Sequence, residues 1–465
     1  MGVSTRECYE AIVGRGLWPL YEGTLRRRDT FKYKVEFEKN QWLSGEELRE
    51  LQWQRLGKLL EHAFNTSPFY RESFDSAGLK PKDIQSPSDF IKLPIVEKAT
   101  VRQNKERMVS SRFHAKDLVK SATGGSSGEP MALYYDWNSY QRRMAAAMRG
   151  DSWAGWRFCG GEYYIWGVSL LPQSGFKRVK VQAFHAGLRR YVVNSFDLGA
   201  DKIAGFVRDF NKMRPRVVVG YTNAVYQFAL HAKAAGLKMI PPKGVITSAE
   251  KLYPYQREAI EEAFGAKVFD RYGCREVMMI GAECDYQNGL HATVDNLYIE
   301  IVKNGVPCEP GELGEVLLTD LHNYGMPLIR YKVGDVASWK GKDCPCGRGL
   351  PLLNVVEGRV FGLLTTPGGR IVSGALFPHL FKDFPAIETF KVIQEEKSFV
   401  RIRLKTRGEF PAAQYDLLRS TVENTLGDDV RIEWTIGPDV EIEKERKFNP
   451  VISKVPVDMG LSISS

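Results

Sequence analysis

The sequence has no hydrophobic run long enough to cross a bilayer. A transmembrane helix needs about 18 or more consecutive apolar residues, and no stretch of the 465-residue chain reaches that length. The first ten residues, MGVSTRECYE, also lack the apolar core of a secretion signal. Internal repeats and low-complexity segments are absent as well. We therefore expect a cytoplasmic globular protein with no membrane span.

Cysteine and histidine are scarce, with seven of each. An odd number of scattered cysteines does not suit a disulfide framework and favours packing, metal binding or chemistry. Cys344 and Cys346 form one tight pair, and Cys284 and His291 lie upstream in ECDYQNGLH. Three thiolates and one imidazole make a closed tetrahedral set, which is typical of structural Zn²⁺. The sequence thus predicts a zinc site that stabilises the fold; the alternative is two buried thiols beside an unrelated turn.

The composition is that of an ordinary globular protein. The hydrophobic fraction of 43% and the charged fraction of 26% exclude wholesale disorder and fibrous repeats. The length favours two or more domains. A formal charge of +9 favours anionic partners. Nucleic acid is not expected among them, because no basic stripe interleaved with aromatic residues is present.

The hydrophobic pattern predicts an α/β fold in two domains. The first 120 residues or so are mainly helical, and Ser44, three residues before Glu47, resembles a capping box. Residues 216–221, 243–247 and 266–272 are strand candidates separated by helical stretches. This alternation indicates a parallel or mixed sheet with crossover helices. We expect a large N-terminal domain (1–357) of mixed sheets and flanking helices, with an antiparallel or barrel-like subregion around 292–340. A small α+β C-terminal domain (358–465) follows, in which TFKVIQEEKSFVRIRLK indicates a hairpin and AAQYDLLRSTVENTLG a helix.

Three short motifs could carry chemistry. SATGGSSGEP, at 121–130, can wrap its backbone around phosphates, although it lacks the Gly-Lys-Ser/Thr ending of a P-loop. In DRYGCRE, Tyr272 could face a base and Glu276 could bind magnesium at the carboxyl end of a strand. In RYKVGD, the carboxylate of Asp335 could accept from both hydroxyls of a ribose. Taken singly, each also suits a flexible loop, solvated surface or an ordinary turn.

The order of these motifs resembles the adenylate-forming (acyl-activating) superfamily. The phosphate loop is followed by SAE, YGCRE, RYKVGD, EGR and a terminal lysine. The resemblance runs from about residue 40 to about 455 and is closest to the phenylacetate–CoA ligase and coenzyme F390 synthetase group, including CapK-like members. VITSAEKLYPYQREAIEEAFGAKVFDRYG, TDLHNYGMPLIRYKVGD and CPCGRGLPLL carry it most specifically.

The resemblance implies a ligase that uses ATP and Mg²⁺ to join a carboxylic acid to CoA through an acyl-adenylate. Glu276 would bind Mg²⁺, Asp335 the ribose, and Lys447 the carboxylate and α-phosphate. A mobile C-terminal domain would deliver Lys447. The remaining nucleotide contacts would come from Thr123, Gly124, Gly125, Ser126, Ser127, Gly128, Ser248, Ala249, Glu250, Tyr272, Gly273 and Arg359.

Some positions depart from the pattern of the family. Met131 replaces the Lys that is usual in the family, and Arg275 replaces the usual Thr or Ser. Arg446 stands where Gly is usual, so Lys454 is a rival to Lys447 as the lysine that acts in adenylation. Phe361 replaces an acidic hinge residue. This replacement leaves open an amine or hydroxyl acceptor in place of CoA.

Two further questions stay open from the sequence. The acyl substrate would be held near Tyr164, Trp166, Tyr221 and Tyr226, which would suit an aromatic or planar acid. The alternative is that these four residues only pack in the hydrophobic core. A homodimer is compatible with the sequence but not required by it. A non-catalytic nucleotide-binding protein is the remaining alternative, and the presence of Glu276, Asp335 and Lys447 argues against it.

Overall fold

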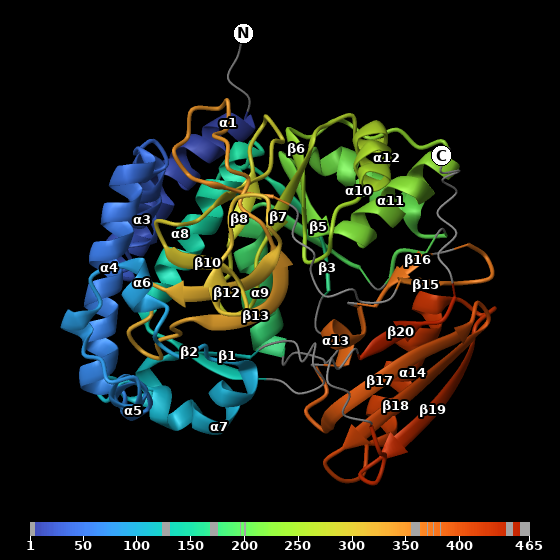
Figure 1. Ribbon diagram of the computed structural model, residues 1–465. Helices are drawn as coiled ribbons and strands as arrows, with labels where there is room; N and C mark the ends of the chain where they lie inside the picture. Colours follow the sequence, from blue (N-terminus) through green and yellow to red (C-terminus); the bar gives the residue numbers. More distant parts are fainter. Residues whose placement is uncertain are drawn as a thin grey trace, which may run out of the picture.

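The computed structural model describes residues 5–122, 131–167, 175–195, 197–199, 201–354, 363–369, 371–374, 376–381, 383–442 and 450–455. Figure 1 shows a body on the left and top, and a smaller orange-red part at the lower right. No described helix combines the length and the apolarity that a membrane crossing needs.

The N-terminal part is helical, as predicted. α4 begins at the capping box that the sequence indicated: the Glu47 N–H donates to Ser44 Oγ (3.2 Å), and the Ser44 N–H donates to Glu47 Oε2 (2.7 Å). Its leucines face the main core. The elements are α1 (Thr5–Tyr9), a π-helical turn (Glu10–Leu17), α2 (Trp18–Leu20), a second π-helical turn (Tyr21–Leu25), α3 (Thr30–Asn40), α4 (Gly45–Thr66), α5 (Pro68–Ser76), α6 (Pro87–Phe90) and α7 (Lys98–Met108).

An eight-stranded mixed sheet forms the centre of the body, in the order β14-β9-β8-β7-β6-β5-β3-β4. The strands from β7 to β4 are parallel, and β8, β9 and β14 are antiparallel additions. The strands are β3 (Glu162–Trp166), β4 (Arg190–Asn194), β5 (Val217–Tyr221), β6 (Gly244–Ser248), β7 (Val268–Tyr272), β8 (Gly281–Glu283), β9 (Leu290–Ala292) and β14 (Leu352–Leu353). The three strand candidates are therefore confirmed.

Helices cover both faces of this sheet. In β5, Val218 packs into the core beneath α10–α12, whereas Val217 and Val219 pack with residues that follow α8. This alternation of side chains is what a strand buried on both faces requires. α8 (Trp137–Trp153) precedes β3, and the crossover helices are α9 (Gly175–Gly187), α10 (Ile203–Met213), α11 (Thr222–Ala234) and α12 (Pro254–Phe264).

A separate antiparallel sheet has the order β11-β10-β12-β13. Its two ends are not paired with each other, so these described strands form an open sheet and the barrel-like part of the prediction is not confirmed. Its strands are β10 (Leu297–Lys303), β11 (Val306–Pro307), β12 (Gly314–Asp320) and β13 (Tyr331–Ala337). β1 (Val119–Ala122) and β2 (Ala132–Tyr135) pair beside it (Figure 1).

The C-terminal part has a buried core of its own, built around β17, β18 and α14. The predicted hairpin and the following helix are both present here. The predicted domain boundary at 357/358 lies outside the described residues and stays a prediction. The elements are β15 (Leu363–Thr365), β16 (Ile371–Ser373), α13 (Leu376–Phe381), β17 (Ile387–Glu396), β18 (Phe399–Thr406), α14 (Ala412–Leu426), β19 (Arg431–Gly437) and β20 (Val451–Ser453).

Candidate active site

Four predicted site residues lie where neighbouring parallel strands end. Trp166 ends β3, Tyr221 ends β5, Ser248 ends β6 and Tyr272 ends β7. The register pairs Tyr221 with Ser248, and Ser248 with Arg271. Because the carboxyl ends of parallel strands share one edge of a sheet, this edge is where α/β proteins place ligands. The structure thus aligns the predicted nucleotide and acyl residues along one edge.

Tyr272 connects this edge to the antiparallel sheet. Its hydroxyl donates to Asp335 Oδ2 across 2.8 Å, and Asp335 lies in β13. Burial, with the charge of Asp335, raises the pKa of Tyr272 well above its usual value, so the phenol stays a donor at neutral pH. The neighbouring Gly273 must be glycine, since a Cβ there would lie 1.9 Å from the Met278 carbonyl oxygen. The sequence suggested roles for Tyr272 and Asp335 but not their contact.

Glu276 is buried, with 5% of its surface exposed. The hydroxyl of Tyr331, which is fully buried in β13, donates to Glu276 Oε1 at 2.9 Å. The preceding residue, Arg275, accepts a 2.7 Å hydrogen bond at its carbonyl oxygen from the Tyr135 hydroxyl at the end of β2. Two tyrosines therefore hold the segment that carries Glu276. Sequence reasoning missed both, although Tyr331 lies inside the RYKVGD motif.

The segment Ser248–Ala249–Glu250 is held in an unusual backbone conformation. Ala249 has φ +71°, in the left-handed region that L-residues rarely adopt. The first turn of α11 holds the next residue: the Thr222 hydroxyl donates to the Glu250 carbonyl oxygen (3.0 Å), and the Asn223 N–H donates to Glu250 Oε2 (2.8 Å). Strained backbone of this kind persists only where surrounding contacts enforce it, and it is concentrated at functional sites.

The aromatic residues expected near an acyl group fall into two sets. The rings of Trp166 and Tyr221 lie 4.2 Å apart between centroids, and the Tyr164 ring lies 6.3 Å from Trp166. The guanidinium of Arg190 also lies over the Tyr164 ring, 4.4 Å from the ring centroid. Tyr226 lies on α11 and packs against Tyr255, at 5.6 Å. The first three residues thus form one aromatic group at the sheet edge.

Several predicted residues lie outside the described part of the chain. These are the loop Thr123, Gly124, Gly125, Ser126, Ser127 and Gly128, together with Arg359, Phe361, Arg446 and Lys447. The rival lysine is described: Lys454 follows β20 and pairs with Glu395 Oε2 at 2.5 Å. This contact lowers the pKa of the Glu395 carboxyl. Met131, which directly follows the loop, is buried in the main core.

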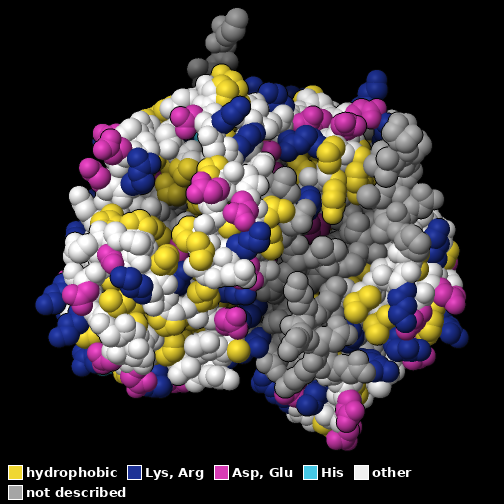
Figure 2. Space-filling view, viewed as in Figure 1, with side chains coloured by type: hydrophobic (Ala, Val, Ile, Leu, Met, Phe, Trp, Pro, Cys, Tyr) yellow, Lys and Arg dark blue, Asp and Glu magenta, His cyan; other side chains and the backbone are white. Residues whose placement is uncertain are grey.

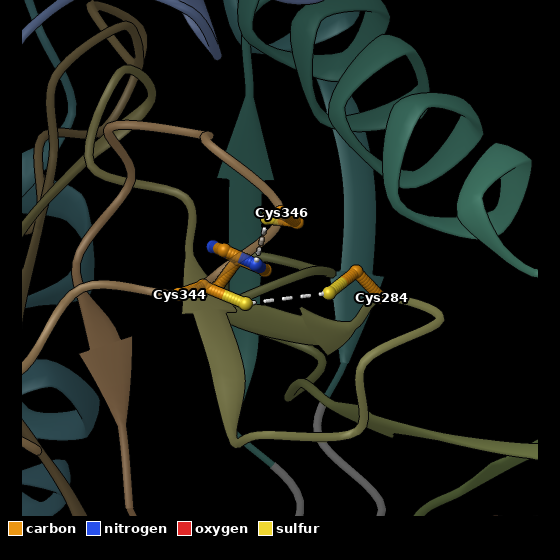
Figure 3. Close-up of side chains that lie close together, drawn as sticks. Cys284, Cys344 and Cys346 are labelled. Carbon is orange, nitrogen blue, oxygen red and sulfur yellow. Dashed lines mark hydrogen bonds between the residues drawn. The ribbon is translucent and has the colours of Figure 1, made fainter.

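The four predicted zinc ligands lie together (Figure 3). Their ligand atoms are all within 4.8 Å of one another. Cys284 Sγ and Cys344 Sγ are 3.6 Å apart, and Cys346 Sγ lies 3.3 Å from His291 Nε2. A tetrahedron around Zn²⁺ has edges of about 3.8 Å between sulfurs and about 3.5 Å between sulfur and nitrogen, given its bond lengths. The donor set therefore fits zinc in both chemistry and spacing.

The surroundings of this cluster orient its ligands. The Leu350 carbonyl oxygen can only accept, so His291 Nδ1 donates to it (3.1 Å) and Nε2 presents its lone pair towards Cys346. Burial lowers the pKa of His291 to about 4 and raises that of Cys284 to about 12. Buried thiolates need a compensating cation, which a metal ion supplies.

The fold is that of acyl-CoA ligases of the adenylate-forming superfamily. A solved 2-hydroxyisobutyryl-CoA ligase, in the postadenylation state with an acyl-AMP, matches with a TM-score of 0.58 and 22% identity over 90% of this chain and 91% of that one. The same ligase with 2-HIB-AMP and CoA, in the thioesterification state, matches with a TM-score of 0.57.

Curated relatives that the chain matches in sequence are phenylacetate–CoA ligases and CapK. The chain is 29% identical over 316 residues to the phenylacetate–CoA ligase of Escherichia coli, covering 63% of this chain and 67% of that one. It is 24% identical over 292 residues to protein CapK of Staphylococcus aureus, covering 62% of each. The corresponding ligase of Thermus thermophilus is 24% identical over 71% of this chain and 74% of its own. No family model matches the chain. The resemblance stated from the sequence is thereby confirmed.

Proposed function

We propose that this protein activates a carboxylic acid with ATP, releases pyrophosphate, and transfers the acyl group to CoA. The observation that supports this most is the arrangement of Tyr272, Asp335 and Glu276 at the carboxyl edge of the parallel strands. The relatives named phenylacetate–CoA ligases favour the same chemistry.

In the first half-reaction a carboxylate oxygen attacks the α-phosphorus of ATP, and pyrophosphate leaves. Both reactants are anions, so positioning and charge neutralisation dominate the barrier. Asp335 would accept from the ribose hydroxyls with its orientation set by Tyr272. The backbone at Ala249 and Glu250 would border the adenine, and Lys447 would neutralise the carboxylate and α-phosphate. Thr123–Gly128 and Arg359 would hold the remaining phosphate and nucleotide groups.

Glu276 suits a magnesium ligand. Its carboxylate is a hard oxygen donor, as Mg²⁺ prefers, and the Tyr331 hydroxyl fixes one of its two oxygens. When bound, Mg²⁺ neutralises charge on the phosphates. The role of this chain is to present the carboxylate already oriented, at the edge where Tyr272 also lies.

In the second half-reaction the thiolate of CoA attacks the acyl carbonyl, and AMP leaves with the bonding electron pair. We propose that residues 358–465 form a domain that moves between the two steps, as conformational steps of this kind accompany such chemistry. Trp166 and Tyr221 would contact the acyl group, and their closely packed rings suit a planar or aromatic acid. Tyr164 would lie behind them, and Tyr226 further along α11.

Cys284, His291, Cys344 and Cys346 would bind structural Zn²⁺. Four protein ligands leave no open coordination position on the ion, as in structural zinc sites. Because the ligands come from two segments, the ion would join the 344–346 turn to the segment around β8 and β9. It would not take part in acyl transfer.

A second candidate differs only in the acceptor, which would be an amine or hydroxyl. Two features favour it: Phe361 in place of an acidic hinge residue, and the similarity to CapK. Product analysis decides between the two. Incubation with ATP, Mg²⁺ and a panel of acids, with and without CoA, should give an acyl-CoA only when CoA is present. An ester or amide that forms equally well without CoA would replace the thioester proposal.

A further inference from the structure

Exposed hydrophobic side chains gather in two segments, residues 12–25 and α9 with β4. More than half of the large hydrophobic side chains that are exposed in the described part of the chain lie there. Leu17, Leu20 and Leu25 are 58%, 60% and 76% exposed. The whole set is Ile12, Leu17, Leu20, Tyr21, Leu25, Val179, Val181, Phe184 and Tyr191. Exposed apolar clusters of this kind mark interaction surfaces.

The two segments contact each other directly. The Trp18 ring lies 5.9 Å from the Phe184 ring, and the Tyr9 hydroxyl donates to the Gly187 carbonyl oxygen at 2.8 Å. The helical segment 5–25 is held to the body by its opposite side: Glu10 and Gly14 are buried there. Glu10 pairs with Arg157 (3.2 Å). The leucines therefore stay outside while the segment itself is anchored.

Cations border this apolar cluster. Residues 176–191 contain five Lys or Arg residues and no Asp or Glu, and Arg26–Arg28 follow the first segment. Arg27, Arg178 and Lys180 are exposed. Glu22, the acidic residue of the first segment, pairs with Arg28, and Glu10 before the segment pairs with Arg157. By contrast, basic and acidic side chains are interspersed over the described part of the face in Figure 2.

We propose that this apolar–basic face, residues 12–28 together with 178–191, docks on an anionic lipid bilayer. Leucines beside arginines and lysines are the pattern of a helix that lies in the interface plane, with apolar groups among the acyl chains and cations at the headgroups. A second copy would place the same cations against each other, which like-charge repulsion opposes. Part of the +9 charge thus serves a membrane surface. This inference does not depend on the proposed reaction.

Flotation of the full chain with vesicles tests the inference. Vesicles of 30% phosphatidylglycerol in phosphatidylcholine should bind the protein, and pure phosphatidylcholine vesicles should bind it far less. The Arg178→Gln/Lys180→Gln double variant should lose about 20- to 30-fold in partition coefficient, since each cation near an anionic surface contributes roughly a factor of five. Leu17→Gln/Leu20→Gln should lose at least about tenfold.

Val306→Gln/Leu313→Gln provides the matched control. These residues are also exposed, at 61% and 48%, but they lie in or next to the antiparallel sheet of β10–β13, outside the proposed face. The control should float like the unaltered chain, and all variants should keep the same circular dichroism. The inference is overturned if the anionic vesicles do not bind the protein, or if the control loses as much binding as the leucine variant. Dimerisation that light scattering detects and that Leu17→Gln/Leu20→Gln abolishes would assign the face to a second copy.

Discussion

A buried phenol helps to orient the Glu276 carboxylate. Tyr331 is buried, and its hydroxyl is 2.9 Å from Oε1. A hydrogen bond to a charged group contributes about 1.5–3 kcal/mol, more than one between neutral groups. Tyr331 is thus a positioning residue: it acts on the proposed magnesium ligand and not on a reacting atom.

Tyr331→Phe should therefore raise the Mg²⁺ concentration for half-maximal activity by about tenfold or more, while kcat at saturating Mg²⁺ changes little. A Mg²⁺ titration of pyrophosphate release measures both quantities. Tyr70→Phe is the matched control, because Tyr70 is also buried and its hydroxyl bonds only backbone groups, Pro327 O (2.9 Å) and Ile329 N (3.1 Å). An equal Mg²⁺ shift in both variants would contradict the positioning role.

At the scale of elements, the cysteine cluster joins segments distant in sequence. Cys284 follows β8, His291 lies in β9, and Cys344 and Cys346 lie in the turn that precedes β14. The sequence supplied the set of ligand types, because few other cysteines or histidines compete for the role. It could not supply their distances, which depend on the pairing of β14 with β9.

Cys284→Ala should abolish metal binding and lower Tm by at least about 5 °C, since binding to the folded state alone stabilises it. Inductively coupled plasma analysis should find about one zinc per chain in the unaltered protein. Cys159→Ala removes another buried cysteine that lies outside the cluster and should keep the metal. Full zinc content in Cys284→Ala, or none in the unaltered protein, would refute the site.

The two candidate lysines near the C-terminus, Lys447 and Lys454, should differ in their roles. Lys454 pairs with Glu395 beside β20. Lys447→Ala should lower adenylation at least about 100-fold, as removal of a charge-stabilising group does, whereas Lys454→Ala should stay within about threefold. Rates of ATP–pyrophosphate exchange compare them. The reverse pattern would assign adenylation to Lys454.

Local patterns were predicted well because their causes are local. The Ser44–Glu47 box, the β5, β6 and β7 strands and the 412–426 helix all follow from nearby residues. For β10–β13 the antiparallel alternative is present and the barrel-like one is not confirmed, because strand pairing is a long-range property that periodicity does not record. The same limit hid the Tyr272–Asp335 and Tyr331–Glu276 contacts, which span 63 and 55 residues.

At the scale of the whole molecule, the two sheets meet at one site. β7 supplies Tyr272, and β13 supplies Asp335 and Tyr331. The hydrogen bonds between them mean that the edge of the parallel sheet and the antiparallel sheet position each other. A ligase that must hold two anions together needs this kind of preorganised frame.

The central claim is that the protein forms an acyl-adenylate, and isotopic ATP–pyrophosphate exchange tests it most directly. With Mg²⁺ and without CoA, label from pyrophosphate should enter ATP only when a suitable carboxylic acid is added. Glu276→Gln keeps an oxygen for Tyr331 but removes the charge, and should lower this exchange about 100-fold or more. Exchange that needs no acid, or that persists unchanged in Glu276→Gln, would contradict the account.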